Sequence, residues 1–443
     1  MKSLYLLIIL YLELTSYKSI KGISLFEEKE KEKKDEKVIA TITTDDESEL
    51  KKALFYLYKL GGIIYIDTPV INFKNSGSLS VTGTLDGGIV GIKQSNGEYP
   101  RLNFQAQRDN STSFYSSGLS VVASNKIIKD LIIESAGSYG IFINGQKNTI
   151  DHVITRYNGQ SGIYISSGSE HNTFNYCYSY RNFHFLENNL IADGFTIEIG
   201  AINNIFNNCF AWENSQNGFG YYYWNGKNKN GEITYTHSGN WNNGNMDVFS
   251  GKYDFDNEKP LDKKLWTIQQ IIKSNKDFEN NYNNKIFNLD SITLNSKPAN
   301  TYFSYYNAVD HGSGFNFGHE KIEESNTEIR VVDYCVSFDH ISKGFNNNGS
   351  KNITAFVTNT VGFNNNMNYE LPFMFSKWSN NWSWDSKEED NFNNEMEIER
   401  PNDANSAKKN FYSVRDQITK AVYANQFPED INFDKVIKSL KSE

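Results

Sequence analysis

Carboxylates and histidines in the central part of the chain are too scattered to form a known catalytic or metal-binding motif. A glycosidase needs two carboxyl groups at a fixed separation. No two aspartates are adjacent between residues 140 and 370, and Gly318-His319-Glu320 stands alone. The chain also has no P-loop, dinucleotide fingerprint or zinc ligand set. The pattern therefore argues against hydrolysis by paired carboxylates, nucleotide-dependent chemistry and zinc chemistry.

Two short patterns recur along the chain and indicate the elements that position its side chains. Cys177, Cys209 and Cys335 lie in similar segments that read as a strand edge followed by a turn. The second pattern is glycine followed by an aromatic or aliphatic residue, and its uninterrupted copies are 22 and 24 residues apart. It occurs at Gly140-Ile141, Gly162-Ile163, Gly194-Phe195, Gly218-Phe219, Gly314-Phe315, Gly344-Phe345 and Gly362-Phe363.

Short alternating segments between these landmarks predict strands rather than helices. Examples are Ile127–Ile133, Gly140–Ile143 and Ser161–Ile165. A period just above 20 residues with several short strands is typical of a right-handed parallel β-helix, so we expect an all-β solenoid. The chain has 58 asparagines in 443 residues. Asparagine tolerates left-handed turns, and stacked asparagines can form hydrogen-bonded ladders from coil to coil.

Segments outside the repeat predict caps and linkers. Residues 49–60 carry apolar positions at helical spacing and end before Gly61-Gly62, which indicates an amphipathic helix that caps the first coil. The expected organisation is a signal peptide at 1–22, a charged linker at 23–40, the solenoid at 41–385 with an insertion at about 255–300, a polar linker at 386–409, and a tail with some helix at 410–443 that packs on the solenoid.

The N-terminal segment and the net charge indicate where the protein acts and which partners it can bind. A basic start and the apolar run Leu4–Leu12 predict a signal peptide and secretion, with no membrane span in the mature chain; an uncleaved anchor is the alternative. The mature chain is expected to be a monomer. The net charge of −9 argues against nucleic acid. An acidic polysaccharide would need a local basic patch or a bridging cation such as calcium.

Sequons and cysteines add modification candidates. Four Asn-x-Ser/Thr sequons, at Asn110, Asn348, Asn352 and Asn381, are glycosylation candidates in a eukaryotic host. Three cysteines do not make a disulfide framework, although a bond between Cys177 and Cys209 in successive coils remains an option.

The order and spacing of several motifs resemble polysaccharide lyase family 9, the pectate-lyase-like β-helix enzymes. The motifs are Ala192-Asp193-Gly194-Phe195, Cys209-Phe-Ala-Trp-Glu-Asn214, Asn242-Asn-Gly244, Gly312-Ser-Gly-Phe-Asn-Phe-Gly318 and Lys343-Gly-Phe-Asn-Asn-Asn348. This resemblance implies β-elimination on polygalacturonate: a lysine base removes the C5 proton of a uronate, and calcium stabilises the charge that develops.

The residues that the resemblance assigns to this chemistry are mostly replaced. Of the family's four calcium-binding aspartates, Asp193 is kept, while Gln216, Asn217 and Gly220 replace the others. Since calcium affinity follows the number of carboxylates, a calcium site is expected to be weak or absent. Asn316 stands at the position of the lysine base, and an amide cannot act as a general base. Asp193 itself is also a typical turn residue.

Two functions therefore stay open. One is a secreted, lyase-like β-helix that binds acidic polysaccharide without cleaving it. The other is an active lyase with a rebuilt site, in which Lys343, His311 or His319 supplies the base. Tyr221, Tyr223 and Trp224 follow the altered calcium segment and are candidates to stack on sugar rings or, equally, to pack on the solenoid.

Overall fold

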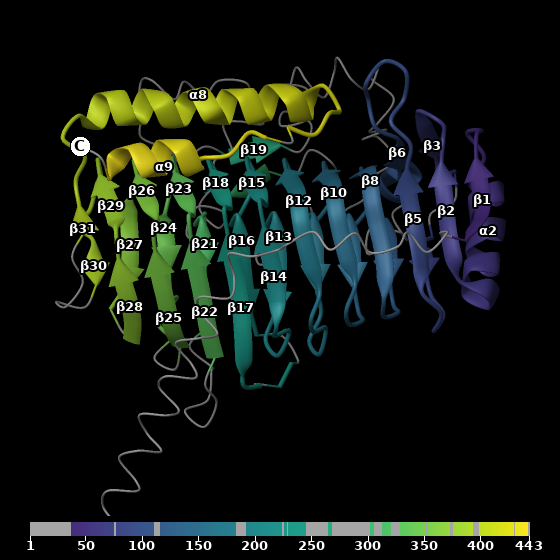
Figure 1. Ribbon diagram of the computed structural model, residues 1–443, viewed down its shortest axis with the longest axis horizontal. Helices are drawn as coiled ribbons and strands as arrows, with labels where there is room; N and C mark the ends of the chain where they lie inside the picture. Colours follow the sequence, from purple (N-terminus) through teal and green to yellow (C-terminus); the bar gives the residue numbers. More distant parts are fainter. Residues whose placement is uncertain are drawn as a thin grey trace, which may run out of the picture. The chain divides into compact units, whose positions relative to one another are not determined.

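Parallel strands stack coil upon coil in the computed structural model of the chain (Figure 1). It describes residues 37–74, 77–109, 116–182, 192–223, 226–227, 229–244, 265–267, 302–304, 312–319, 328–350, 353–372, 375–392, 398–428 and 430–441. The expected signal peptide, almost all of the insertion at 255–300, and the residues Asn110, Trp224, His311 and Asn352 lie outside these ranges.

One face of the coils forms a ten-stranded parallel sheet. Its strands, in sheet order, are β4 (Leu79–Val81), β7 (Leu119–Val121), β9 (Ile141–Ile143), β11 (Ile163–Ile165), β13 (Phe195–Glu198), β16 (Phe219–Tyr222), β21 (Phe315–Asn316), β24 (Lys343–Asn346), β27 (Met367–Leu371) and β30 (Asn391–Phe392). Each strand is short because the chain turns after two to five residues to reach the next face. Its members come from successive coils, as the 22- and 24-residue spacing predicts.

The other faces form a nineteen-stranded sheet. Its strands are β1 (Val38–Ile42), β2 (Gly62–Ile66), β3 (Val70–Asn72), β5 (Gly87–Gly91), β6 (Arg101–Asn103), β8 (Lys126–Glu134), β10 (Thr149–Arg156), β12 (Thr173–Tyr180), β14 (Asn204–Asn207), β15 (Phe210–Trp212), β17 (Gly231–Thr236), β18 (Gly239–Trp241), β22 (Glu328–Asp333), β23 (Val336–Phe338), β25 (Ile353–Thr358), β26 (Val361–Phe363), β28 (Phe375–Ser379), β29 (Asn381–Trp384) and β31 (Ile398–Glu399). A separate antiparallel pair joins β19 (Leu265–Thr267) to β20 (Tyr302–Ser304).

Left-handed residues bend this sheet around the coil. Strand β12 pairs with β14 before Tyr176 and with β15 after it, and Tyr176 has φ 49°. The same corner carries a left-handed residue in eight coils, and five of the eight are not asparagine. They are Asp130, His152, Tyr176, Asn208, His237, Tyr334, Asn359 and Asn380. The expected asparagine turns are confirmed, but other residue types also occupy the left-handed corner.

Buried asparagines form the expected ladder from coil to coil. The Asn158 and Asn182 backbone N–H groups donate to the side-chain oxygens of Asn182 and Asn214, at 3.2 and 3.1 Å, and Asn214 N–H donates to Asn243 at 3.0 Å. The next member is His340, whose Nδ1 accepts from Asn243 N–H at 3.1 Å. Each step satisfies a buried backbone donor that the turn would leave unpaired.

Aromatic side chains stack inside the solenoid. Phe195, Phe219, Phe315, Phe345 and Tyr369 form a continuous interior column with centroid separations of 4.7, 4.8, 5.2 and 4.9 Å. The register places each ring directly on its equivalent in the next coil. Cys177, Cys209 and Cys335 are buried and free, so the structure holds no disulfide between Cys177 and Cys209.

Helix α2 (Glu47–Leu60) covers the first coil, as expected from the sequence. Asp46 caps its first turn by accepting from Ser48 N–H, and Gly61 follows its last turn with φ 62°. Leu50, Ala53 and Leu57 are buried in the solenoid core. The helix thereby covers apolar side chains that the open end of the solenoid would expose to water.

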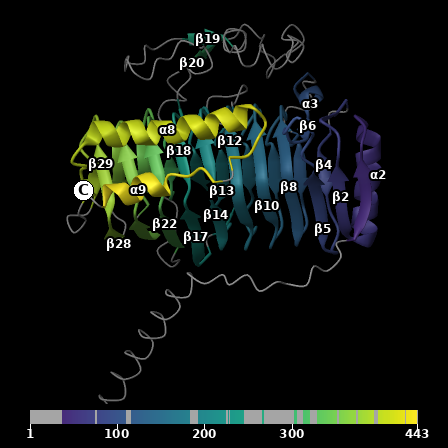
Figure 2. The ribbon, with the colours of Figure 1, turned by 45° about the horizontal axis from the view of Figure 1, so that its top comes forward.

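The C-terminal helices cover the outer side of the nineteen-stranded sheet. Helix α8 (Ala404–Tyr423) begins inside the stretch expected as a linker, and α9 (Asp434–Leu440) follows it across strands β12 to β29 (Figure 2). Phe411, Val422 and Ile437 pack against an outer aromatic column. That column consists of Tyr180, Trp212, Trp241, Phe338, Phe363 and Trp384.

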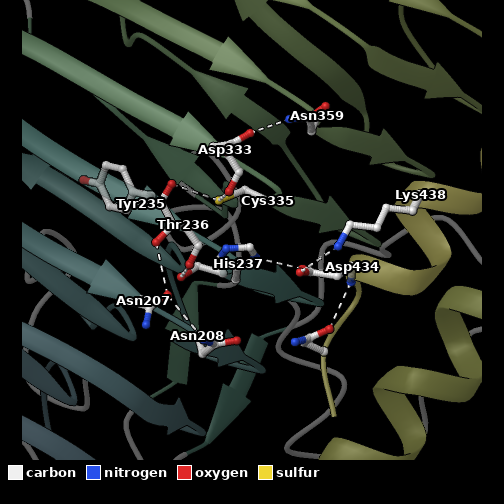
Figure 3. A network of polar contacts seen from close by, with 12 residues as sticks. Asn207, Asn208, Tyr235, Thr236, His237, Asp333, Cys335, Asn359, Asp434 and Lys438 are labelled. Atoms are coloured by element: carbon white, nitrogen blue, oxygen red, sulfur yellow. Dashed lines mark hydrogen bonds and ion pairs between the residues drawn. The ribbon is translucent and has the colours of Figure 1, made fainter. Parts of the chain in front are cut away.

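Polar contacts hold α9 at the bent corner of the coils. His237 Nδ1 lies 2.8 Å from Asp434 Oδ1, and Lys438 pairs with the same carboxylate at 3.9 Å (Figure 3). Beside them Asp333 accepts a hydrogen bond from Asn359. Apart from the short helix α3 (Gln105–Asp109), the described coils contain no helix. Among the described helices, none is both long and apolar enough to cross a membrane.

Candidate functional site

The outward side chains of the ten-stranded sheet form one column that crosses the coils in register. Strand pairing places each member beside its equivalent in the next coil. In order they are Ser80, Ser120, Phe142, Tyr164, Thr196, Gly220, Asn316, Asn346 and Glu370. Gly220 and Asn316, two of the positions singled out from the sequence, are therefore neighbours in this column.

Asp193 lies just before the column, and its carboxylate is fully buried. Oδ1 accepts from the Asn217 backbone N–H at 2.9 Å and from the Tyr222 hydroxyl at 3.2 Å, while Oδ2 accepts from Thr196 Oγ1 at 2.9 Å. Burial raises the pKa of Asp193 to about 7, although these hydrogen bonds favour the charged form. The carboxylate thus has partners on both oxygens, in the manner of a structural turn residue.

Amides at the altered calcium positions join neighbouring coils. Gln216 Oε1 accepts from Ala192 N–H at 3.1 Å. Asn217 Oδ1 accepts from Ser313 N–H at 3.0 Å, and its amide nitrogen donates to the Tyr222 hydroxyl at 2.6 Å. Both side chains are engaged with protein partners.

Tyr222 occupies the space in front of Gly220. A Cβ atom built at Gly220 would lie 2.1 Å from Asp193 Oδ2 and 2.4 Å from Cε2 of the Tyr222 ring. Such distances leave no room for a side chain. An aspartate at this position would require Tyr222 to move. Tyr222 was not predicted to be part of the site. The glycine at position 220, two residues earlier, is the feature of the sequence that could have indicated it.

Asn316 lies beside Gly220 in the next coil, and its side chain is 6% exposed. Its Oδ1 accepts a long contact of 3.4 Å from Gly318 N–H. Asn346 follows it in register. The position that the resemblance assigns to a lysine base therefore carries an amide set in the sheet.

The substitute bases do not lie in the column position of Asn316. Lys343 begins β24, three residues before Asn346, and its ammonium pairs with Glu370. His319 is half-buried, with its ring centroid 6.0 Å from that of Tyr223.

The sugar-stacking candidates need one correction. Tyr221 points into the solenoid, is fully buried, and donates its hydroxyl to Glu328 Oε2 at 2.7 Å. The Arg330 guanidinium lies 4.6 Å from its ring. The alternation of a strand puts Tyr221 on the inner face, so it cannot contact a sugar outside the coils. Tyr223 is 40% exposed and stays a candidate.

Calcium does not fit the residues present at this site. Calcium takes six to eight oxygen ligands and is held mainly by carboxylates. Asp193 is the one carboxylate at the four positions, both of its oxygens have protein donors, and Tyr222 fills the place of another ligand. Within the described ranges, no group of three or more His, Cys, Asp or Glu side chains could hold a metal ion.

Two of the sequons lie in the described part of the chain, and they differ in exposure. Asn348 is exposed at a turn with φ 49°. Asn381 is fully buried: it accepts from Thr360 N–H at 2.9 Å and donates to Val357 O at 3.0 Å. The prediction of a glycan at Asn381 does not fit the folded protein, since the amide nitrogen is buried and bonded.

Stacked parallel coils with an outward column beside Asp193 define a parallel β-helix of the pectate-lyase type. A family model described as "Pel9A-like, right handed beta helix region" matches residues 33–256. The chain belongs to this family, and the predicted all-β, right-handed solenoid is confirmed.

Individual relatives match shorter stretches. Over 105 residues the chain is 29% identical to pectate lyase L of Dickeya chrysanthemi and 30% identical to pectate lyase L of Paenibacillus polymyxa (strain SC2). Each match covers 24% of this chain, and 25% and 21% of the respective relatives. The crystal structure of pectate lyase Pel9A aligns with a TM-score of 0.48 and 18% identity, covering 76% of this chain and 70% of that one.

Proposed function

We propose that the protein is a secreted β-helix that binds pectate-like polysaccharide and does not cleave it. The family and the similarity to two pectate lyases support the ligand class. The apolar run at Leu4–Leu12 supports secretion. A polysaccharide chain would lie along the ten-stranded sheet, where the column of outward side chains crosses successive coils.

The observation that carries the proposal is that Asp193 is buried and that both of its carboxylate oxygens accept hydrogen bonds from protein groups. Elimination needs a cation on the uronate carboxylate and a base at C5. Asp193 is buried with its oxygens bonded to Thr196, Asn217 and Tyr222, and Asn316 replaces the base. The cation site and the position of the base are both altered, so restoring one of them alone would not restore the reaction.

An active lyase with a rebuilt site is the second candidate, and Lys343 at the start of β24 is the base considered for it. The Lys343 side chain would have to leave Glu370, and its nitrogen would have to be a neutral amine, before it could take a proton from the substrate. If Lys343 were the base, Lys343→Gln would abolish cleavage.

The test measures the absorbance of the unsaturated uronate product on polygalacturonate, with calcium and with a chelator. We expect no rise for the wild type in either condition. The repaired chain must combine Asn316→Lys, Gln216→Asp, Asn217→Asp and Gly220→Asp with Tyr222→Ala, because Tyr222 blocks a side chain at Gly220. A rise for the wild type would overturn the proposal, and cleavage by the repaired chain would support loss of chemistry from a competent fold.

A further inference from the structure

Three stacked aromatic rings lie on the outer face of the ten-stranded sheet, next to the Asp193 site. Ring centroids of Tyr139 and Tyr164 are 4.3 Å apart, and those of Phe142 and Tyr164 are 5.7 Å apart, with interplanar angles of 25° and 15°. Phe142 and Tyr139 are half-buried and Tyr164 is 6% exposed. The three rings therefore form one layered surface whose outer member is Phe142.

Contacts anchor this surface to the candidate site. The Tyr164 hydroxyl donates to Glu198 at 3.0 Å, and the next outward residue after Tyr164 is Thr196, which donates to Asp193. Burial raises the pKa of Tyr139, and the negative charges of Glu198 and Asp193 raise it further. The Tyr164 ring is thus fixed through its hydroxyl to Glu198, one strand away from Asp193.

The free face of the stack points along the column toward two serines. Phe142 is in register with Ser120, and Ser120 with Ser80, which is exposed. The Ser120 side chain is much smaller than the Tyr164 ring on the other side, and the Phe142 residue is half-buried. Within the described part of the chain, neither hydroxyl has a hydrogen-bond partner.

A flat apolar face beside free hydroxyls matches a sugar ring, which has apolar C–H groups on its face and hydroxyls on its edge. The column from Ser80 to Asn346 contains no charged side chain. A carboxylate placed there would lose water without gaining a cation. The ring that fits this surface is therefore uncharged.

We propose that Phe142, with Ser120 and Ser80, forms a sugar-binding subsite for an uncharged pyranose ring of a polysaccharide lying along the ten-stranded sheet. This inference rests on the proposed function and narrows its ligand. Such a ring is either a methyl-esterified uronate or a neutral hexose, and both present the same face and hydroxyls.

Calorimetric titration of the full chain with three probes tests the subsite: oligogalacturonide, its methyl ester, and a neutral galacto-oligosaccharide. We expect the methyl ester or the neutral glycan to bind more tightly than the free acid, and the tighter of these two identifies the source. Phe142→Leu keeps apolar volume but removes the flat ring, and should weaken that binding about tenfold or more. Phe356→Leu is the matched control, because Phe356 is 37% exposed on β25 of the other sheet.

A second variant distinguishes loss of binding from loss of the fold. Ser120→Asp adds a charge at a partly exposed position and should abolish binding of the free acid and weaken binding of the uncharged glycans. Tighter binding of the free acid by the wild type, or unchanged affinity in both Phe142→Leu and Ser120→Asp, would overturn the subsite while leaving the proposed function intact. Failure of the wild type to bind any of the three probes would overturn both.

Discussion

The Tyr222 hydroxyl donates to Asp193 Oδ1 at 3.2 Å and at the same time accepts from the Asn217 amide at 2.6 Å. One side chain thereby connects the retained carboxylate with an amide that replaces another. Its ring also fills the space in front of Gly220. Asp193, Asn217 and Tyr222 are thus bonded to one another, and Tyr222 also occupies the space of a side chain at Gly220.

Tyr222→Phe should destabilise the protein by about 1 to 3 kcal/mol, because it leaves the Asn217 amide and Asp193 with one partner fewer in a buried place. Chemical denaturation measures the change in the free energy of unfolding. Tyr56→Phe on helix α2 is the control, since Tyr56 is 42% exposed and should change little. Equal effects of the two substitutions would contradict the role given to the hydroxyl.

Asp193 should make the protein less stable as the pH rises. Its folded pKa, about 7, lies above the ordinary value of 3.8, so the folded state holds a proton that the unfolded state has lost between these values. Stability from this group is full below about pH 4 and decreases by up to about 1.4 kcal/mol per pH unit until about pH 7. Asp193→Asn should remove this dependence, measured as the difference in melting temperature between variant and wild type across pH.

His340 should act in the opposite direction. Burial lowers the pKa of His340 from 6.5 to about 3. Its ring takes the place of an asparagine in the ladder, and its Nδ1 accepts from Asn243 N–H. Stability is full above about pH 6.5 and falls as the pH drops toward 3, because only the unfolded state takes up the proton. His340→Asn restores an amide oxygen and should reduce acid sensitivity. A variant that melts with the wild-type pH dependence would contradict this assignment.

Breaking the asparagine ladder should cost more than losing an exposed amide. Asn214 accepts from Asn182 and donates to Ser179 O at 3.1 Å, in a fully buried turn. Asn214→Ala leaves these groups unpaired and should cost about 2 to 4 kcal/mol in unfolding free energy. Asn405→Ala on the exposed side of α8 is the matched control and should change stability by less than about 0.5 kcal/mol.

Glycan attachment should discriminate between two sequons. When the chain is secreted from a eukaryotic host, Asn348→Gln should remove a glycan and lower the mass seen by mass spectrometry. Asn381→Gln should leave the glycan mass unchanged and lower the melting temperature, because Asn381 bonds Thr360 and Val357. A glycan on Asn381 in the folded protein would contradict its burial.

The coil repeat and the capping helix could be predicted from the sequence, because strand alternation and the glycine–aromatic spacing are local patterns. Asparagine ladders followed from the same reasoning. The left-handed corners at Tyr176 and His237 could not, since neither residue type signals that conformation and only the stacked register imposes it. The start of α8 at Ala404 was not predicted, because it lies within a polar stretch that was expected to be a linker.

The site was predicted in part. Motif order singled out Asp193, Asn217 and Asn316. In the structure Asn217 N–H donates to Asp193, and the strands that carry Gly220 and Asn316 pair. Tyr221 was assigned outward although alternation from Phe219 puts it inside the coil. Tyr222 and the stack at Phe142 were missed, because their roles depend on which side chains from neighbouring coils lie beside them.

The central claim is that the Asp193 site no longer binds calcium, and a calorimetric calcium titration tests it most directly. It should be run at about pH 8.5, where Asp193 is mostly ionised and best able to bind a cation. The account predicts no stoichiometric binding and identical curves for the wild type and Asp193→Asn. One equivalent of calcium bound by the wild type and lost in Asp193→Asn would contradict it.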